Sequence, residues 1–496
     1  MASRTHLLSS RKNDQAGLAH FMHRVLKEST RAARRFDEDS VHDLRVALRR
    51  SRTIADGLAS FDPDKSLRAV KKASRDLFRS LGVLRDIQIK LEWLEKLAPE
   101  DDSLKSRLRE TLAREEELAK AAASAALADF DVRRWRKWSR TLPGASRRVA
   151  PGSVVFEHLA LARWIEAREA HRRAVRSRSR IAWHRVRIAL KRFRYTVENF
   201  LPQRYTEWAD GLKNVQDSLG AVHDLDVLWV TLRKLSAGAD PAELEFWRGC
   251  IAAARAANLS AYRARTFGRQ SLWNVWRAGL PDGERLEQAS LATLAAWASH
   301  LDPDFDHSRR VAALALELND GFRTAALHET FRDVRARRLL EAAALLHDVG
   351  RARKESGHHK ISCRMIRKRT PPIGWTSDDM LWTALIARYH RGGDPRPEHG
   401  GYSSLLPAER QSITWLGATL RLADGLDADH KGRVTHVSVE STRPLVMLRA
   451  EGYVHDVESA AVLAKKKHLL ETLCARAIIV RPAEEISART IATLAS

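Results

Sequence analysis

His42-Asp43-Leu44-Arg45-Val46-Ala47-Leu48-Arg49-Arg50-Ser51-Arg52 returns later in the chain as His184-Arg185-Val186-Arg187-Ile188-Ala189-Leu190-Lys191-Arg192-Phe193-Arg194. Both copies fit the pattern H-x-x-R-[VI]-A-L-[RK]-R-x-R. At about 100° per residue, the histidine and three of the cations lie on one face of a helix, along about 15 Å of its length. Like charges at this spacing repel each other and destabilise a helix. The doubled stripe therefore indicates an anionic ligand.

A second shared element follows each copy. Leu81-Gly82-Val83-Leu84-Arg85-Asp86-Ile87 follows the first, and Leu219-Gly220-Ala221-Val222-His223-Asp224-Leu225 follows the second. The histidines of the two copies, His42 and His184, are 184 − 42 = 142 residues apart. This is longer than a solenoid repeat of about 20 to 50 residues, so each copy belongs to a whole helical subdomain. The chain therefore predicts a mostly all-α protein that begins with two pseudo-symmetric helical bundles.

The formal charge of +24 is distributed unevenly over the 496 residues. Residues 1–300 contain 56 Lys and Arg against 37 Asp and Glu, whereas residues 301–496 contain 30 against 25. The N-terminal part is thus expected to face a polyanion, and charge alone leaves nucleic acid, polyphosphate and an anionic surface open. Three isolated cysteines and the lack of an apolar signal or membrane-spanning run predict a cytoplasmic protein without structural disulfides or a membrane partner.

The character of the sequence changes near Gly279–Gly283. A second helical region follows to about His430, and the tail then reads as short strands around one helix. We expect three parts: residues 15–270 with halves of about 15–145 and 150–270, a helical domain at 288–430, and a small α+β subdomain at 431–496.

The repeat and its followers resemble the CHAD domain, the conserved-histidine α-helical domain, over about residues 15–270. That family is built of two helical bundles around a basic channel and is associated with inorganic polyphosphate, so the resemblance implies this fold and this partner. Carried over by position, the implied polyphosphate contacts are His42, Arg45, Arg49, Arg52, His184, Arg187, Lys191 and Arg194. Four cations ahead of Leu81-Gly82 are candidates for the same groove: Lys71, Lys72, Arg75 and Arg79.

The physical interpretation of the stripes agrees with this resemblance. A flexible polyanion offers closely spaced charges and no base edges, and cationic rows from two helices match it through counterion release and charge-assisted hydrogen bonds. Arginine dominates the rows, as expected for forked donors that bind phosphate oxygens. The alternative interpretation is two solvated arginine-rich faces, with the histidines as ordinary core residues.

The second half of the chain contains spaced histidines and aspartates. His307 begins an expected helix, and His347-Asp348 follows the apolar run Leu339–Leu346. Three later segments continue the series: Gly357-His358-His359-Lys360, Arg388-Tyr389-His390-Arg391 and Leu422-Ala423-Asp424-Gly425. Imidazoles with carboxylates suit divalent Mg, Mn, Fe, Zn or Ni. The Asp of a His-Asp pair can bridge two ions about 3.5–4 Å apart.

The order H…HD…H…H…D resembles the HD phosphohydrolase superfamily, and residues from about 288 resemble the C-terminal region of the exopolyphosphatase/guanosine-pentaphosphatase (Ppx/GppA) family. By position, the implied metal ligands are His307, His347, Asp348, His359, His390 and Asp424, with His358 orienting His359. Asp348, Lys360 and Arg391 are the candidate catalytic residues, and Arg388 is a further candidate for substrate phosphate. Two features depart from that family. Ile361 stands where a further histidine is common, and the glycine-rich phosphate loops of the family's actin-like ATPase domain are missing.

Three functions are compatible with these features. The leading hypothesis is a polyphosphate-binding protein whose HD domain is a metal-dependent phosphohydrolase acting on polyphosphate or on a phosphorylated nucleotide such as (p)ppGpp. The alternative is a non-catalytic polyphosphate-binding or granule scaffold with a ligand-sensing HD domain. A third hypothesis is a nuclease or nucleic-acid binder, which the basic charge supports. The alternating cations and tryptophans of Arg133-Arg134-Trp135-Arg136-Lys137-Trp138 could stack on bases, unless those tryptophans pack in the core.

Overall fold

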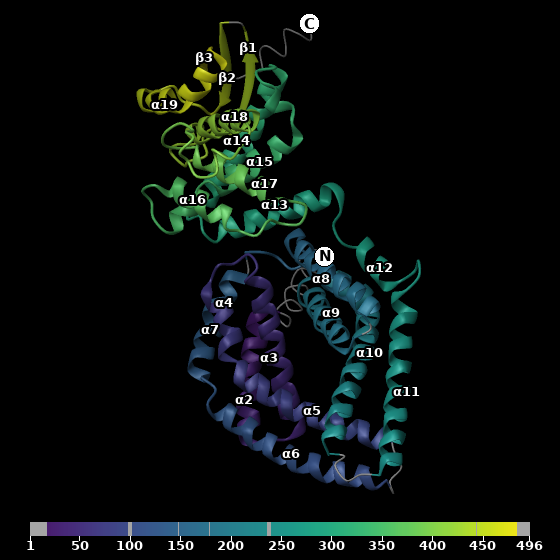
Figure 1. Ribbon diagram of the computed structural model, residues 1–496. Coiled ribbons are helices and arrows are strands. Elements are labelled where there is room, and N and C mark those ends of the chain that lie inside the picture. The colour runs from purple at the N-terminus through teal and green to yellow at the C-terminus, as the bar shows by residue number, and fades with distance from the viewer. Residues whose placement is uncertain are drawn as a thin grey trace, which may run out of the picture. The chain divides into compact units, whose positions relative to one another are not determined.

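The computed structural model describes residues 17–97, 102–146, 148–177, 179–235, 240–442 and 444–483. In these ranges the protein is mostly all-α, as the sequence predicted (Figure 1). The chain divides into two compact units, Met1–Ala289 and Ser290–Ser496. Among the described helices, none combines the length and the apolar character that crossing a bilayer requires.

The first unit consists of two sets of packed helices. Its helices are α2 (Leu18–Arg34), α3 (Glu38–Leu58), α4 (Lys65–Ala73), α5 (Arg75–Leu97), α6 (Ser103–Ala128), α7 (Val132–Ser146), α8 (Val154–Ser177), α9 (Arg180–Phe200), α10 (Pro202–Leu235), α11 (Pro241–Thr266) and α12 (Leu272–Ala278). Helix α2 packs on α3 and α7, and α5 packs on α6. In the other half, α9 packs on α8 and α10, and α10 packs on α11 (Figure 1). The two copies of the repeat lie on α3 and α9, and their followers lie on α5 and α10.

The two halves meet where α3 contacts α9 and where α5 contacts α10. Gly57 makes the first contact possible, because an added Cβ there would lie 2.5 Å from a ring carbon of Phe200. Beside this contact, Arg50 of α3 forms an ion pair with Glu198 and donates a hydrogen bond of 2.9 Å to Asn199. Equivalent helices of the two halves are thus joined directly at the repeat.

Local sequence explains why the repeat segments are helices. Asp37 caps α3 by accepting a hydrogen bond of 2.8 Å from the Ser40 amide, and Ser179 caps α9 through the Ala182 amide at 3.1 Å. The apolar positions between the cations are buried: Leu44, Ala47 and Leu48 on α3, and Val186, Leu190 and Phe193 on α9. Each helix therefore buries one face and leaves the cationic stripe on another.

Helix α13 (Gly283–Ser299) spans the boundary between the units. The second unit continues with α14 (Phe305–Thr324), η1 (Glu329–Arg332), α15 (Val334–Leu346), η2 (Val349–Ala352), α16 (His358–Arg367), α17 (Ser377–Arg388), α18 (Pro407–Leu426) and α19 (Val457–Cys474). Helix α15 contacts α14, α17 and α18, and eight of its residues are buried. The core of this unit lies around α15.

A three-stranded sheet of order β1-β2-β3 follows these helices: β1 (His436–Ser441), β2 (Leu445–Glu451) and β3 (Ala477–Pro482). Strands β1 and β2 are antiparallel with His436 opposite Glu451, and β3 runs parallel to β2 with Ala477 opposite Leu445. A parallel neighbour requires a crossover, which α19 supplies. The last residues of the expected α+β tail, 484–496, lie outside the described ranges.

Candidate anion trough and metal centre

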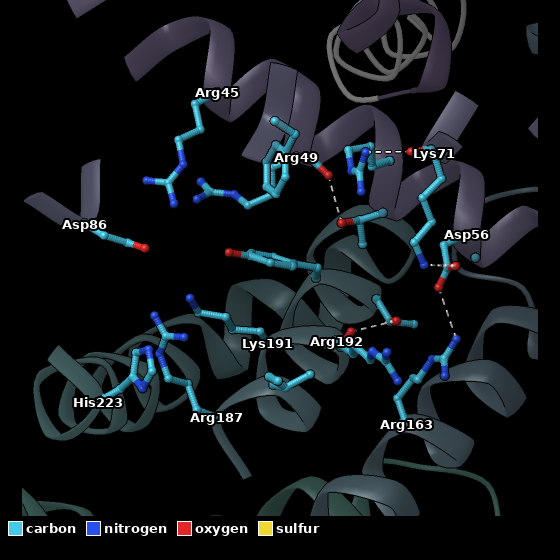
Figure 2. A pocket seen from close by; sticks show the side chains of 17 residues that line it. Arg45, Arg49, Asp56, Lys71, Asp86, Arg163, Arg187, Lys191, Arg192 and His223 are labelled. Atoms are coloured by element: carbon cyan, nitrogen blue, oxygen red, sulfur yellow. Dashed lines mark hydrogen bonds and ion pairs between the residues drawn. The ribbon is translucent and has the colours of Figure 1, made fainter. Parts of the chain in front are cut away.

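A cavity of about 380 Å³ in the first unit is lined by both copies of the repeat. Arg45, Arg49 and Arg52 line it from α3, and Arg187, Lys191, Arg192 and Tyr195 line it from α9. We call this cavity the basic trough. Its remaining lining residues are Thr53, Asp56, Gly57, Lys71, Phe78, Asp86, Arg163, Ile188, Thr196 and His223. Figure 2 shows Arg45 and Arg49 on one side and Arg187 and Lys191 on the other, with their charged ends directed toward the space between them.

One part of the trough has excess positive charge. The Nε atoms of Arg45, Arg49 and Arg187 are buried and have no hydrogen-bond partner within the described part of the chain. Burying an unpaired guanidinium donor is costly. Such an arrangement is therefore expected where an anion supplies the missing acceptors.

Elsewhere in the trough, the cations are already paired. Asp56 lies 3.0 Å from Lys71 Nζ and 3.5 Å from an Arg163 nitrogen. Arg52 donates hydrogen bonds of 2.7 Å to the Lys71 carbonyl and 2.8 Å to the Ser74 hydroxyl. The cations that remain for a ligand are concentrated around Arg45, Arg49, Arg187 and Lys191.

The crowding of cations changes the acidity of their neighbours. Burial, together with Arg187, Arg49 and Arg45, lowers the pKa of Lys191 to about 7. Burial, together with Arg187 and His184, lowers the pKa of His223 to about 4, so this imidazole is neutral at pH 7. Burial also lowers the pKa of Arg45, and nearby Arg49 contributes to that shift.

Six of the predicted polyphosphate contacts are not among the residues that line the trough: His42, His184 and Arg194, which the resemblance implied, and the further candidates Lys72, Arg75 and Arg79. His184 is half-buried, and its Nδ1 lies 3.2 Å from Nδ1 of His223, which does line the trough. The Nε of Arg194 lies 4.0 Å from Glu198. His42, Lys72, Arg75 and Arg79 are exposed. Sequence reasoning did not identify Tyr195 or His223, although His223 lies in the second follower motif.

The tryptophans of the Arg133–Trp138 segment pack in the protein interior. Trp135 and Trp138 are buried, and the Trp135 indole donates a hydrogen bond of 3.0 Å to the Met22 carbonyl. These two rings therefore offer no stacking surface for bases, which leaves net basicity as the argument for nucleic acid.

In the second unit, the five helices α14, α15, α16, α17 and α18 bring histidines and aspartates together. His307 lies in the first turn of α14, and His347 and Asp348 follow the buried helix α15. His358 begins α16 after Gly357, which has the left-handed φ of 73° that favours glycine. His390 follows α17, and Asp424 lies on α18. We call the set His307, His347, Asp348, His358, His390 and Asp424 the His–Asp cluster.

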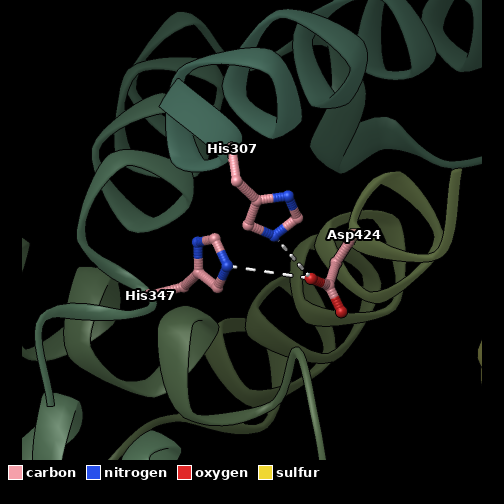
Figure 3. A group of neighbouring side chains, drawn as sticks. All are labelled: His307, His347 and Asp424. Carbon is pink, nitrogen blue, oxygen red and sulfur yellow. Dashed lines mark hydrogen bonds and ion pairs between the residues drawn. The ribbon is translucent and has the colours of Figure 1, made fainter. Parts of the chain in front are cut away.

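The ligand atoms of this cluster lie close to the spacing of a metal's coordination sphere. Asp424 Oδ1 is 3.2 Å from His307 Nε2 and 3.7 Å from His347 Nε2 (Figure 3). Asp348 Oδ1 is 3.6, 3.0 and 3.9 Å from the Nε2 atoms of His347, His358 and His390. Two ligands bound about 2.1 Å from one ion are about 3.0–3.4 Å apart. In two triads the ligand atoms all lie within 4.8 Å of one another, so that small side-chain movements would bring them to this spacing: His307, His347 and Asp424, and His347, Asp348 and His390.

The hydrogen bonds of the imidazoles also fit a cation. The Nδ1 atoms of His347, His358 and His390 donate to the backbone carbonyls of Ala344, Glu355 and Ala387 at 2.7, 2.8 and 2.7 Å. In the neutral rings, Nε2 therefore carries a lone pair that points into the cluster. The Nε2 atoms of His358 and His390 are only 3.2 Å apart, and the Nε2 of His347 is buried without a hydrogen-bond partner in the described chain. A divalent ion would relieve both arrangements.

Electrostatics in the cluster follow from its buried carboxylates. Burial opposes the charged form of His307, but hydrogen bonds to Asp424 and Asp427 outweigh it and raise the pKa to about 9. Burial alone would raise the pKa of Asp348 and Asp424, and the surrounding histidines, with Lys466 beside Asp424, hold both carboxyl pKa values below the ordinary value. Both carboxylates are therefore available as ligands at neutral pH.

A cavity of about 240 Å³ opens beside the cluster. Its lining residues are Asp348, Arg351, Glu355, His358, His390, Arg391, Asp424, Ala428, His430 and Lys466. Of the expected phosphate-binding residues, Arg391 lines this cavity, whereas Lys360 and Arg388 are not among its lining residues. Lys360 is exposed on α16, and Arg388 is half-buried at the end of α17.

The two adjacent histidines of α16 have different environments. His358 reaches Asp348 and His390, whereas His359 has its Nδ1 buried without a hydrogen-bond partner in the described ranges and its Nε2 near Gly392. Burial and the charges of His358 and Lys360 lower the pKa of His359 to about 4. The geometry thus favours His358 over His359 as a ligand, because a helix places successive side chains about 100° apart.

Two cavity residues had no recognisable signal in the sequence. His430 adopts a left-handed φ of 59°, its ring stacks on His307 with centroids 3.8 Å apart, and its Nδ1 lies 2.7 Å from Asp304. Lys466 reaches Asp424 from α19. Neither residue belongs to the H…HD…H…H…D order.

Comparisons with known proteins match a different family to each of the two compact units. The family model of the CHAD domain matches residues 16–233, and that of the Ppx/GppA phosphatase, domain III, matches residues 290–468. A solved structure described as the crystal structure of the CHAD domain from the plant Ricinus communis is 20% identical. It has a TM-score of 0.38 and covers 54% of this chain and 90% of its own. No curated protein matches the chain.

Each unit therefore has a family relationship of its own, and both agree with the resemblances in the sequence. The chain combines a CHAD domain with a domain of the Ppx/GppA phosphatase domain III family.

Proposed function

We propose that this protein binds inorganic polyphosphate in the basic trough and that its second unit is a metal-dependent phosphohydrolase of the HD type. The observation that carries the first part is the group of three half-buried arginines, Arg45, Arg49 and Arg187, which line one cavity and whose buried Nε atoms are unpartnered within the described chain. A linear phosphate chain supplies acceptors of the matching charge, and forked guanidinium donors bind its oxygens well. The CHAD relationship supports the same ligand.

A matched pair of variants on α9 tests the trough. Arg187→Ala removes a cation that lines it, whereas Arg185→Ala removes an exposed cation two residues away that does not. Loss of one charge-assisted contact is expected to weaken binding of medium-chain polyphosphate by about tenfold or more. Titration at fixed salt measures both variants, and equal effects would argue against the trough. Competition with duplex DNA at the same salt tests the nucleic-acid alternative.

The His–Asp cluster supports the second part of the proposal. His307, His347, Asp348, His358, His390 and Asp424 would hold one or two divalent ions, such as Mg, Mn, Fe, Zn or Ni. A bound ion of this kind polarises a phosphoryl oxygen and makes water a better nucleophile at neutral pH. Arg391 lines the adjacent cavity and would bind the phosphate that is cleaved.

The cavity favours polyphosphate over a nucleotide such as (p)ppGpp as the substrate. Nine of its ten lining residues carry ionisable side chains, and the tenth is Ala428. Pockets that recognise organic ligands have about 300–1,000 Å³ and mostly apolar walls. This cavity is smaller, and Ala428 is the one apolar side chain among its lining residues.

Metal analysis and phosphate release test the enzyme. Purified protein is expected to contain a divalent metal, and His347→Ala and Asp348→Ala are expected to lose it. Phosphate release from medium-chain polyphosphate is measured with added Mn²⁺ or Mg²⁺, beside release from ppGpp. Tight polyphosphate binding without release from either compound would support the non-catalytic scaffold instead.

A further inference from the structure

Helix α19 of the α+β segment contributes a cation to the metal centre. It carries three consecutive lysines, of which Lys466 is the one that lines the cavity beside the His–Asp cluster. Lys467 binds the Ile478 carbonyl and Glu471 instead, and Lys465 is exposed. The three side chains therefore differ in environment although they are adjacent in sequence.

Lys466 forms an ion pair with Oδ2 of Asp424. The other carboxylate oxygen, Oδ1, faces the Nε2 atoms of His307 and His347 at 3.2 and 3.7 Å. Asp424 thus presents one oxygen to the metal triad and the other to the lysine. The lysine thus leaves Oδ1 to the two imidazoles and holds the carboxylate in a fixed orientation.

The close approach of α19 to α18 depends on Gly425. A Cβ at this position would lie 2.9 Å from Cγ and 3.0 Å from Cβ of Lys466, and 3.3 Å from a methyl carbon of Leu463. These are atoms near the α19 backbone, so the helix itself would have to move. The glycine next to Asp424 is therefore what allows the lysine stem to lie over α18.

We propose that Lys466 is a phosphate-binding residue of the metal centre, with its ammonium group shared between Asp424 and a phosphate group of the substrate. An ammonium has three N–H donors, so the ion pair with Asp424 leaves two for phosphate oxygens. The side chain is 20% exposed, which lets a ligand in the cavity reach it. Among the other cavity cations, Arg351 is already paired with Asp348 and Glu355 at 3.0 Å each, so Lys466 and Arg391 are the main remaining cationic donors.

This proposal rests on the proposed metal-dependent function, and two binding measurements separate the two. Lys466→Met keeps the aliphatic stem over Gly425 and removes the charge. Lys465→Met is the matched control, and Lys466→Arg restores a cation. Binding of Mn²⁺ and then of inorganic phosphate to the full chain is followed by calorimetry, with a thermal melt to confirm folding.

We expect Lys466→Met to keep Mn²⁺ affinity equal to or above that of wild type, because a cation next to Asp424 is removed, and to weaken phosphate binding by about tenfold or more. Lys466→Arg should recover part of the loss, and Lys465→Met should change neither constant.

Phosphate affinity within about twofold of wild type in Lys466→Met overturns the proposal. So does a folded Lys466→Met protein that loses Mn²⁺ and phosphate together, because Lys466 would then act only through Asp424. If the wild type binds phosphate but no Mn²⁺, the proposed metal centre is wrong. The phosphate affinities of wild type and Lys466→Met then still test whether Lys466 binds phosphate.

Discussion

At the scale of single residues, charge crowding distinguishes Lys191 from the other cations of the trough. Its ammonium group is surrounded by Arg187, Arg49 and Arg45, and its pKa is lowered to about 7. The folded protein therefore binds fewer protons here than the unfolded chain at alkaline pH. The buried ammonium group therefore lowers the free energy of unfolding by its full amount below about pH 7. This destabilisation disappears as the pH rises toward the ordinary pKa of a lysine.

Bound phosphate favours the charged amine and raises this pKa, so binding takes up a proton above neutral pH. Affinity for tripolyphosphate is expected to fall as the pH rises from about 6 to about 9. His223, with a pKa of about 4, stays neutral over that range. Calorimetry in two buffers of different ionisation enthalpy measures the proton uptake, and Lys191→Arg should abolish it. Equal wild-type affinity at both ends of the range would show that Lys191 does not contact the anion.

At the scale of elements, close helix packing sets the geometry of both sites. The turn after α15 packs on α16 through Gly350, whose added Cβ would lie 2.3 Å from the His358 carbonyl and 2.7 Å from the Ser362 amide. Since His358 reaches Asp348 from the start of α16, any displacement of this helix opens the His–Asp cluster.

Gly350→Ala is therefore expected to lower the free energy of unfolding by about 1–3 kcal/mol, because overpacking displaces the helix. Mn²⁺ affinity should fall with it by about tenfold or more. Gly393→Ala is the control, because a Cβ there meets no atom within 4 Å. Calorimetric Mn²⁺ titration and denaturant unfolding measure both effects, and unchanged metal affinity in Gly350→Ala would show that α16 does not hold a ligand.

In the first unit, Gly57→Ala is expected to destabilise the contact between α3 and α9 by about 1–3 kcal/mol, because the new Cβ would overlap the Phe200 ring. Gly82→Ala on α5 meets no neighbour within 4 Å and should leave stability equal or slightly higher. Thermal melting compares the two. A Gly57→Ala protein as stable as wild type would show that the two halves have room to move apart.

Helix positions and types were largely predictable from local patterns. The repeat segments and the buried helix before His347-Asp348 carry the apolar period of a helix and recognisable N-caps, and the three short strands lie within the segments expected as the α+β tail. Which strands pair was not predictable, because the parallel contact of β3 with β2 depends on how α19 packs. The sequence also could not show that His358, and not His359, faces the cluster, because this depends on which side of α16 is turned toward Asp348.

At the scale of the whole molecule, the two sites lie in different compact units and share no residue. Effects on distant sites without shared partners are usually additive. Removal of metal with a chelator is expected to abolish phosphate release and to leave polyphosphate binding unchanged. Conversely, Arg187→Ala should leave the metal content unchanged. Equilibrium binding and metal analysis on the same samples check both statements, and loss of polyphosphate binding after chelation would contradict this independence.

The sequence by itself determined the helical class, the doubled cationic stripe and the order of histidines and aspartates, because these are periodic or local features of the chain. Only the tertiary structure decided which cations share one cavity. It places Arg52 in the trough but Arg194 beside Glu198, although both occupy the same position of the repeat. It also brings His223 and Lys466 into the two sites. These residues enter the sites because helices far apart in the sequence pack together, and the spacing of residues along the chain does not show which helices do so.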